Sequence, residues 1–225
     1  MRAAYLGQDR ADIQFATKEL ARRMSGPTAD DWASLKRLVR YLIQAPRVIV
    51  LYVRQARQRT IDAYSDADWA GCPYTRRSTS STYLMHGGHL LMSSSTTQTV
   101  VATSSGESEF YAAAKSASRL LGAAAMCEDL GVHLDPRLLV DANAAKGIAS
   151  RRGVGRVRHL HVATLWLQEA VNKRRLQIDK QKGTENVADL GTKHLSATVL
   201  QTLMELAGLR VLTGRSAKAL RSATA

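Results

Sequence analysis

The residues Tyr64-Ser-Asp-Ala-Asp-Trp69 stand at the end of a predicted β-strand over residues 60–64. Two further strand patterns, 78–85 and 89–93, follow on either side of Gly87-Gly88, which is a hairpin signal. We expect residues 98–103 to extend the third strand or to add another one. The acidic residues therefore lie at the end of the first strand of a predicted antiparallel meander.

Helices and strands alternate after this meander. The alanine-rich run 105–130 has a helical pattern that closes at Gly131, a residue type favoured just beyond a helix C-terminus. A short strand at 138–141, helices at 142–150 and 159–172, a strand at 176–180 and a short helix at 184–192 complete the predicted order. Three strands followed by helix–strand units predict an α/β fold built on a mixed sheet flanked by helices.

Two helices are predicted before the sheet, over residues 12–24 and 28–44, with Gly26-Pro27 between them. Thr28 and Asp31 form a capping-box-like start to the second helix. One face of this helix carries Trp32, Leu35, Val39, Leu42 and Ile43, and the opposite face carries Lys36, Arg37 and Arg40. We interpret the basic face either as solvated surface or as a contact to a nucleic-acid backbone, since phosphate contacts need only Lys and Arg. Residues 48–53 are a strand candidate and 54–59 a basic connector.

The charge of the chain is strongly positive and unevenly distributed. The 225 residues include 32 Lys and Arg against 19 Asp and Glu, a net charge of +13. Residues 1–60 hold 12 basic and 5 acidic side chains, whereas residues 61–195 hold 16 and 13. This balance suggests a polyanionic partner. No run approaches the roughly 18 apolar residues of a membrane-spanning helix, so we expect no membrane partner.

The two cysteines, Cys72 and Cys127, can form neither a disulfide framework nor a zinc site with the usual ligand spacing. We therefore expect an intracellular, reducing location, either cytoplasmic or nuclear.

Four acidic residues occupy positions from which their carboxylates could meet: Asp66, Glu109, Asp141 and Asp189. Carboxylates forced together repel unless a divalent cation neutralises them, and Mg²⁺ prefers such oxygen ligands. Two such cations about 4 Å apart can clamp the attacking and leaving oxygens of a phosphoryl displacement. A single Asp at a strand end is more often a cap or turn residue, and a Glu can simply suit a helix N-terminus. Spacing alone leaves both interpretations open.

The motifs around these acids are more specific than their spacing. They are residues 64–71, 76–80, 103–112, 140–143, 185–189 and 192–193. In this order they resemble the RNase H domain at the C-terminal end of copia-type retrotransposon Pol polyproteins. The helical block before them resembles that family's segment between polymerase and RNase H, and the resemblance covers residues 9–195.

The resemblance implies three regions. Residues 1–59 would be a basic helical connection segment from the end of a reverse transcriptase region, 60–195 an RNase H-like domain, and 196–225 a C-terminal helix with a basic flexible tail. It also implies an endoribonuclease that hydrolyses the RNA strand of RNA–DNA hybrids with two Mg²⁺ ions, or Mn²⁺. The implied partners are the hybrid and the polymerase part of a Pol polyprotein.

The same resemblance assigns roles to the acids. Asp66 would bridge both ions, Glu109 and Asp141 would hold the ion beside the leaving oxygen, and Asp189 would hold the ion that activates water. Glu109 is preferred to Glu107 because it precedes Phe-Tyr-Ala, and Asp66 is likewise preferred to Asp68; Asp62 is expected to be solvent-exposed. The residues expected to bind nucleic acid are Arg76, Arg77, Asn143, Lys146, Lys36, Arg37 and Arg40.

The sequence also departs from the family pattern. Thr96-Thr97 replace a frequent Lys-Lys pair, and the Gly183-Thr184 loop has no histidine. His159 and His161 are poorly spaced for shared metal ligation, so His159 is interpreted as structural or substrate-adjacent. Because no polymerase Tyr-x-Asp-Asp motif is present, a catalytically inactive nucleic-acid-binding remnant is the alternative function. A DDE transposase is disfavoured, because its Glu would come last rather than second.

Overall fold

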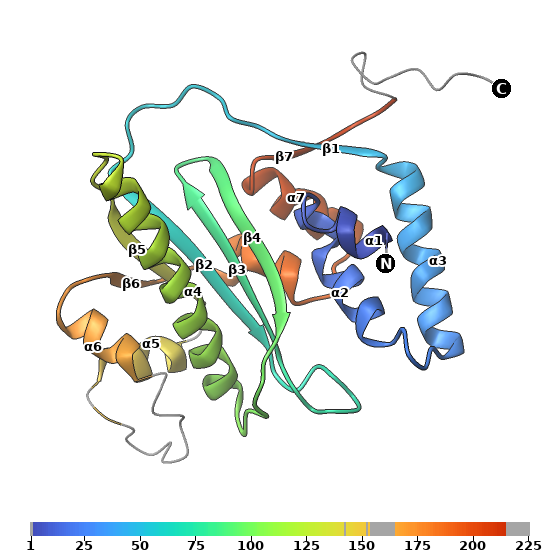
Figure 1. The fold of residues 1–225 in the computed structure, drawn as a ribbon, viewed down its shortest axis with the longest axis horizontal. Coiled ribbons are helices and arrows are strands. Elements are labelled where there is room, and N and C mark those ends of the chain that lie inside the picture. Colours follow the sequence, from blue (N-terminus) through green and yellow to red (C-terminus); the bar gives the residue numbers. More distant parts are fainter. Residues whose placement is uncertain (1, 142, 152, 154–164, 215–225) are drawn as a thin grey trace.

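The computed structural model describes residues 2–141, 143–151, 153 and 165–214. Five strands form a central sheet in the order β4-β3-β2-β5-β6 (Figure 1). They are β2 (Thr60–Asp68), β3 (Thr79–His86), β4 (His89–Thr97), β5 (Asp135–Val140) and β6 (Gln177–Lys180). Neighbours among β2, β3 and β4 are antiparallel, whereas β5 is parallel to β2 and β6 to β5. The predicted mixed sheet, with three antiparallel strands followed by helix–strand units, is therefore confirmed.

The hairpin between β3 and β4 turns at the two glycines that predicted it. His86 pairs with His89, and Gly87 has a φ of 58°, a left-handed conformation that favours glycine. The third strand extends to Thr97, beyond the predicted residue 93. The expectation that residues 98–103 extend this strand or add another one is wrong: they form a connection without strand that leads into the next helix, and the Gln98 side chain donates to the Ser108 carbonyl oxygen at 2.8 Å.

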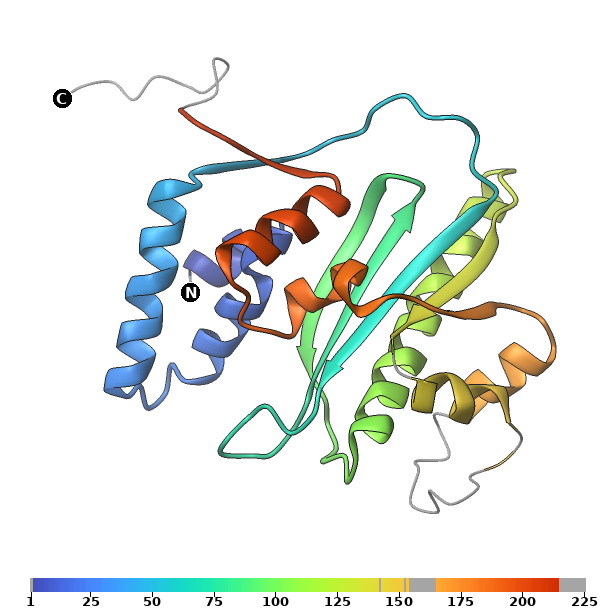
Figure 2. The same cartoon turned by 180° about the vertical axis from the view of Figure 1, so that it is seen from behind.

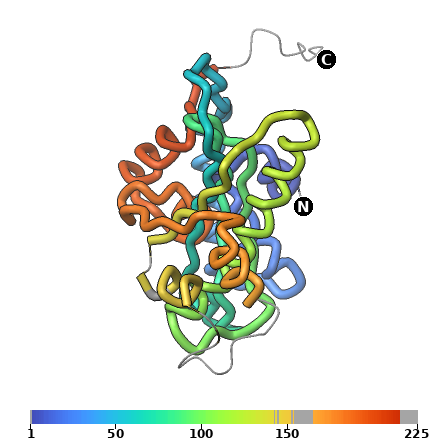
Figure 3. Tube along the Cα trace, turned by 90° about the vertical axis from the view of Figure 1, so that its left-hand side faces the viewer, coloured from blue at the N-terminus to red at the C-terminus, as the bar shows by residue number. Residues whose placement is uncertain are grey.

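One face of the sheet packs against α4 (Ser105–Asp129), and α5 (Asn143–Ser150) and α6 (Trp166–Asn172) join the same core. Ser104 caps α4, and Gly131, with a φ of 75°, follows its end as predicted. Figure 3 shows α4 on the opposite side of the strands from residues 183–206. The large side chains buried between α4, α5, α6 and the sheet include Ile61, Phe110, Leu120, Leu138 and Leu167.

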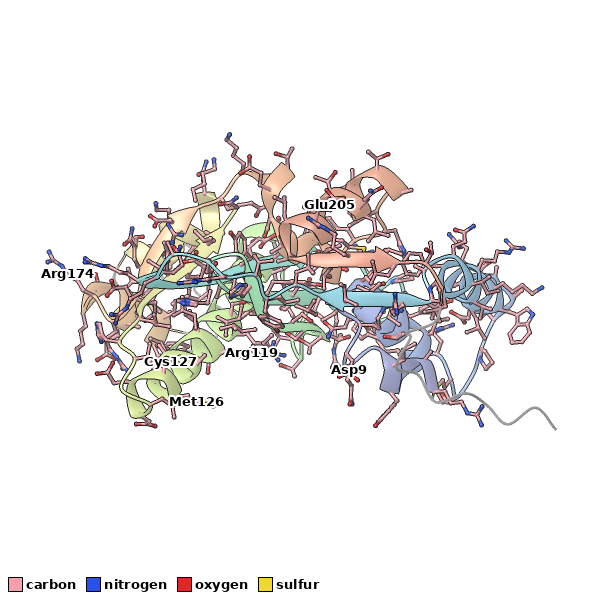
Figure 4. All side chains as sticks on the ribbon, turned by 90° about the horizontal axis from the view of Figure 1, so that it is seen from above. Asp9, Arg119, Met126, Cys127, Arg174 and Glu205 are labelled. Carbon is pink, nitrogen blue, oxygen red and sulfur yellow. The ribbon has the colours of Figure 1, made fainter. Side chains whose placement is uncertain are left out.

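The other face is covered jointly by segments from both ends of the chain (Figure 2). These segments are η1 (Ala11–Ile13), η4 (Val187–Gly191) and α7 (Ala197–Leu206), whereas α2 (Gln14–Arg22) contacts the outer strand β4. Tyr83 of β3 is fully buried and donates its hydroxyl to the Ala11 carbonyl oxygen at 2.9 Å. In Figure 4, Met126 and Cys127 mark the end of α4 below the sheet and Glu205 marks α7 above it. The η1 turn thus contributes Ala11 to the core on this face of the sheet.

A second, two-stranded sheet joins the two ends of the chain. Strand β1 (Arg47–Val50) pairs antiparallel with β7 (Leu209–Leu212). We expected only a helix and a flexible tail after residue 196, and the strand β7 corrects this. It forms because β1 supplies its backbone partners and Leu209 is buried. Residues 215–225 lie outside the described part of the chain.

The helix α3 (Ala29–Gln44) begins with the predicted capping box between Thr28 and Asp31. Its predicted apolar face does not enter the core: the exposed fractions of Trp32 and Ile43 are 59% and 72%. The helix instead turns Leu38 and Tyr41 inward, and the Tyr41 hydroxyl donates to Asp12 Oδ2 at 2.7 Å. Helical periodicity locates an apolar stripe, but packing decides which stripe is covered.

The remaining elements are short. An unpredicted helix α1 (Arg2–Leu6) precedes η1, and the predicted helix over 184–192 is two 3₁₀ turns, η3 (Gly183–Glu185) and η4. Of the predicted helix 159–172 the structure describes α6; His159 and His161 lie outside the described residues. Among the described residues, no helix combines the length and the apolar character needed to cross a membrane.

Candidate active site

Three carboxylates meet at one edge of the central sheet. Asp66 lies near the end of β2, Asp141 directly follows β5, and Glu109 lies in the first turns of α4. Each offers one oxygen, and these oxygens all lie within 4.8 Å of one another. The adjacent strands β2 and β5 are parallel, so their carboxyl ends meet at the same edge, and α4 packs against both. Asp66 and Glu109 are buried, and Asp141 is partly exposed.

The protonation of Glu109 reflects this crowding. Burial, followed by the negative charges of Asp66 and Asp141, raises the pKa of Glu109 to about 9. The Ala67 backbone amide and the Lys193 ammonium act in the opposite direction. Without a cation, Glu109 therefore carries a proton at neutral pH. A set of three carboxylate oxygens matches the ligand preference of Mg²⁺ or Mn²⁺, so the residues fit such an ion.

Asp189 approaches the cluster from η4. Burial and then the charge of Asp66 raise the pKa of Asp189 to about 6, and Asp141 adds to the shift. The Lys193 Nζ atom lies 2.8 Å from Asp189 Oδ1 and 3.5 Å from Asp66 Oδ2. Lys193 therefore bridges the carboxylates of Asp189 and Asp66, whereas the carboxylates of Asp66, Glu109 and Asp141 lie directly beside one another.

Two other acids of the same motifs have separate partners. Glu107 accepts hydrogen bonds from the Thr103 backbone amide at 2.7 Å and its hydroxyl at 2.8 Å, at the start of α4. Asp68 accepts a hydrogen bond from the Thr79 backbone amide. These contacts place Glu107 and Asp68 in local structure, outside the cluster.

Asp62 corrects an expectation, because it is buried rather than solvent-exposed. It accepts hydrogen bonds from Arg137 Nε at 2.9 Å and Nη2 at 2.7 Å. The physical reason is register: Asp62 on β2 lies opposite Arg137 on β5. The sequence contains both residues but no local signal for this pairing.

The residues expected to bind nucleic acid lie in three places. Arg76 and Arg77 are exposed in the loop that follows β2, and Asn143 and Lys146 lie on α5, directly after Asp141. Lys146 Nζ is 3.9 Å from Asp179 Oδ1. Lys36, Arg37 and Arg40 are exposed on α3, where Arg37 lines a cleft of about 680 Å³ that extends to Thr192. Their contact with nucleic acid stays a prediction.

The sequence motifs included the residues that hold Asp66 and Asp189 in place, but no role was predicted for these residues from the sequence. Thr192 donates its hydroxyl to Asp66 Oδ2, and Lys193 pairs with both acids. Asn186 donates to the Ser65 carbonyl oxygen at 3.2 Å. The signal that could have indicated this role was the clustering of these polar residues immediately around Asp189.

Sequence comparison connects this site with known proteins. No family model matches the chain. It is 29% identical over 208 residues to the retrovirus-related Pol polyprotein from transposon RE2 of Arabidopsis thaliana, and 25% identical over 202 residues to that from transposon TNT 1-94 of Nicotiana tabacum. The chain is homologous to retrotransposon Pol polyproteins. The predicted resemblance to Pol polyproteins is thereby confirmed.

The matched region of these Pol relatives is only part of each protein. The alignments cover 91% and 89% of this chain but 14% and 15% of the two polyproteins. Among solved structures, LC11-RNase H1, isolated from compost, is 17% identical with a TM-score of 0.42, and the match covers 60% of this chain and 94% of that chain. This structural likeness is weak, and the strand order and connections given above define the fold.

Proposed function

We propose that the chain is a metal-dependent nuclease that hydrolyses the RNA strand of RNA–DNA hybrids. The observation that carries the proposal is the meeting of Asp66, Glu109 and Asp141 within 4.8 Å at the edge of the sheet. Carboxylates at this spacing, two of them buried, repel one another and need a cation to be ionised together. The homology to Pol polyproteins, and the resemblance of the surrounding motifs to their RNase H domains, support the choice of substrate.

The chain's own residues have distinct tasks in this proposal. Asp66, Glu109 and Asp141 would hold one cation, and Asp189 together with Asp66 would hold a second. Bound Mg²⁺ or Mn²⁺ would polarise the scissile phosphate and lower the pKa of an attacking water. Glu109 has to release its proton before it can act as a ligand, which couples cation binding to pH.

Basic side chains that are exposed or partly exposed would bind the substrate. Arg76 and Arg77, on the loop after β2, and Lys146, on α5 after Asp141, would contact phosphates of the hybrid. Lys36, Arg37 and Arg40 on α3 would extend this contact. The chain matches about one seventh of its Pol relatives, and we propose the polymerase part of such a polyprotein as a partner.

Cleavage of a labelled RNA–DNA hybrid tests the function. We expect RNA cleavage with Mg²⁺ and none with EDTA. Asp66→Asn and Asp141→Asn should abolish cleavage, because each removes a charged ligand. Asp129→Asn, a change of the same type at the exposed end of α4, should cleave like the wild type.

Hybrid binding, measured by gel shift in EDTA, separates the nuclease from the alternative function. Intact RNA despite hybrid binding by the wild-type chain would overturn the nuclease and favour a nucleic-acid-binding remnant. Cleavage of both strands, or of RNA alone without DNA, would contradict the proposed substrate.

A further inference from the structure

Lys193 places a positive charge among the acids of the site. Its Nζ atom lies 2.8 Å from Asp189 Oδ1 and 3.5 Å from Asp66 Oδ2. The two carboxylates are well shielded, with side-chain exposed fractions of 1% for Asp66 and 14% for Asp189. Shielded carboxylates need a counter-charge. The ammonium of Lys193 provides it at the place where a second cation would have to bind.

The neighbouring residue acts on the same carboxylate oxygen. Thr192, which is buried, donates its hydroxyl to Asp66 Oδ2. This oxygen therefore interacts with two consecutive residues, a hydroxyl donor and an ammonium. A carboxylate oxygen has about two lone-pair directions. The Thr192 hydroxyl occupies one of these directions, and the positive charge of the Lys193 ammonium, 3.5 Å away, opposes a cation shared between Asp66 Oδ2 and Asp189.

We propose that Lys193 competes with a divalent cation for the Asp66–Asp189 pair. The site then binds one cation tightly, through Asp66, Glu109 and Asp141, and a second only weakly. The inference rests on the proposed nuclease, which needs cations, and it concerns how many of them the protein holds. The side chain of Lys193 is 41% exposed. Because the lysine can move outward, the expected effect is a weakened second site and not a blocked one.

Titration with Mn²⁺ alone, without nucleic acid, tests the proposal. We expect calorimetry on the wild type to show one tight and one weak site. Lys193→Met removes the charge but keeps much of the side-chain volume, and should tighten the second site by about tenfold or more, the range over which residues around ligands tune metal affinity. Electron paramagnetic resonance should then show a spin-coupled Mn²⁺ pair at concentrations where the wild type shows isolated ions.

Two variants serve as controls. Lys182→Met also removes one positive charge, but the Lys182 side chain is 81% exposed and pairs with Glu185, not with Asp66 or Asp189. Mn²⁺ binding by this variant should therefore match that of the wild type. Lys193→Arg keeps the positive charge and should keep the second site weak. Thermal melting in EDTA identifies any variant that does not fold, in which case Lys193→Gln replaces Lys193→Met.

The outcomes separate this inference from the proposed function. Equal second-site affinity in the wild type and in folded Lys193→Met or Lys193→Gln would overturn the competition, whether or not hybrids are cleaved. Two equally tight sites in the wild type would also overturn it. Absence of hybrid cleavage together with the expected Mn²⁺ difference would refute the nuclease and leave the role of Lys193 standing.

Discussion

The Asn186 side-chain amide donates a hydrogen bond to the Ser65 backbone carbonyl oxygen, 3.2 Å away, across 121 positions of sequence. Ser65 precedes Asp66 on β2, and Asn186 stands three residues before Asp189. Asn186 is fully buried, and its Oδ1 accepts from the Ala188 backbone amide at the start of η4. One side chain thus joins the strand that carries Asp66 to the turn that carries Asp189.

Asn186→Ala should lower the free energy of unfolding by about 1–3 kcal/mol, because it leaves a buried carbonyl without its donor. Denaturant unfolding measures this change. Asn172→Ala, at the exposed end of α6, is the matched control and should be nearly neutral. Equal stability of the two variants would contradict the role given to Asn186.

The stability of the cation-free protein should fall as pH rises toward 9. The pKa of Glu109 is 4.5 when unperturbed and about 9 in the folded chain, so between these values the folded state binds more protons than the unfolded state. Folding stability then decreases with rising pH. Glu109→Gln, which stays neutral, should lack this contribution. Its melting temperature in EDTA should exceed that of the wild type increasingly from pH 6 to pH 9.

Glu205→Gln is the control for this pH dependence, because Glu205 is exposed on α7. Its melting curve should follow the wild type at every pH. Parallel curves for Glu109→Gln and the wild type would show that Glu109 ionises normally in the folded protein.

Asp62→Ala should destabilise the sheet by leaving Arg137 without its partner. The side-chain exposed fractions are 10% for Asp62 and 38% for Arg137. Water can therefore solvate part of the guanidinium, and we expect a loss of about 1–2 kcal/mol instead of the larger cost of breaking a fully buried pair. Chemical unfolding measures the loss. Asp129→Ala changes the net charge equally at an exposed position and should cost much less.

The basic face of α3 should contribute to the salt dependence of hybrid binding. A triple variant with Ala in place of Lys36, Arg37 and Arg40 should bind with a weaker salt dependence. The slope of log K for hybrid binding against log salt concentration should fall by about 0.9 for each phosphate that these side chains neutralise in the wild type. Fluorescence anisotropy in EDTA across a salt series measures the slope.

The control is a second triple variant, with Ala in place of Lys173, Arg174 and Arg175, which removes an equal charge. These residues lie at the end of the molecule far from α3, as the position of Arg174 in Figure 4 shows. Equal slopes for the two triple variants would show that net charge, and not direct binding by α3, is responsible. Deleting residues 1–59 would be a poorer test, because Ile13 and β1 belong to the folded core.

Much of the fold was predictable from the sequence because its signals are local. Gly87-Gly88 predicted the hairpin, the Thr28–Asp31 spacing predicted the cap of α3, and the alternation of helices and strands predicted the mixed sheet. Each signal acts within a few residues of chain, where covalent geometry limits the choices. The four candidate acids were also identifiable from their motifs, although their roles as metal ligands stay predictions.

The tertiary structure alone decided which of these residues meet. Asp62 pairs with Arg137 because two parallel strands align in one register, and β7 forms because β1 lies beside it. The inward turn of Leu38, which leaves Trp32 exposed, depends on what packs against α3. Lys193 stands among the carboxylates because η4 docks on β2 through Asn186. The sequence by itself determined which acidic and basic groups the chain carries and in which motifs they stand. Long-range packing determined that a lysine shares the site with the acids.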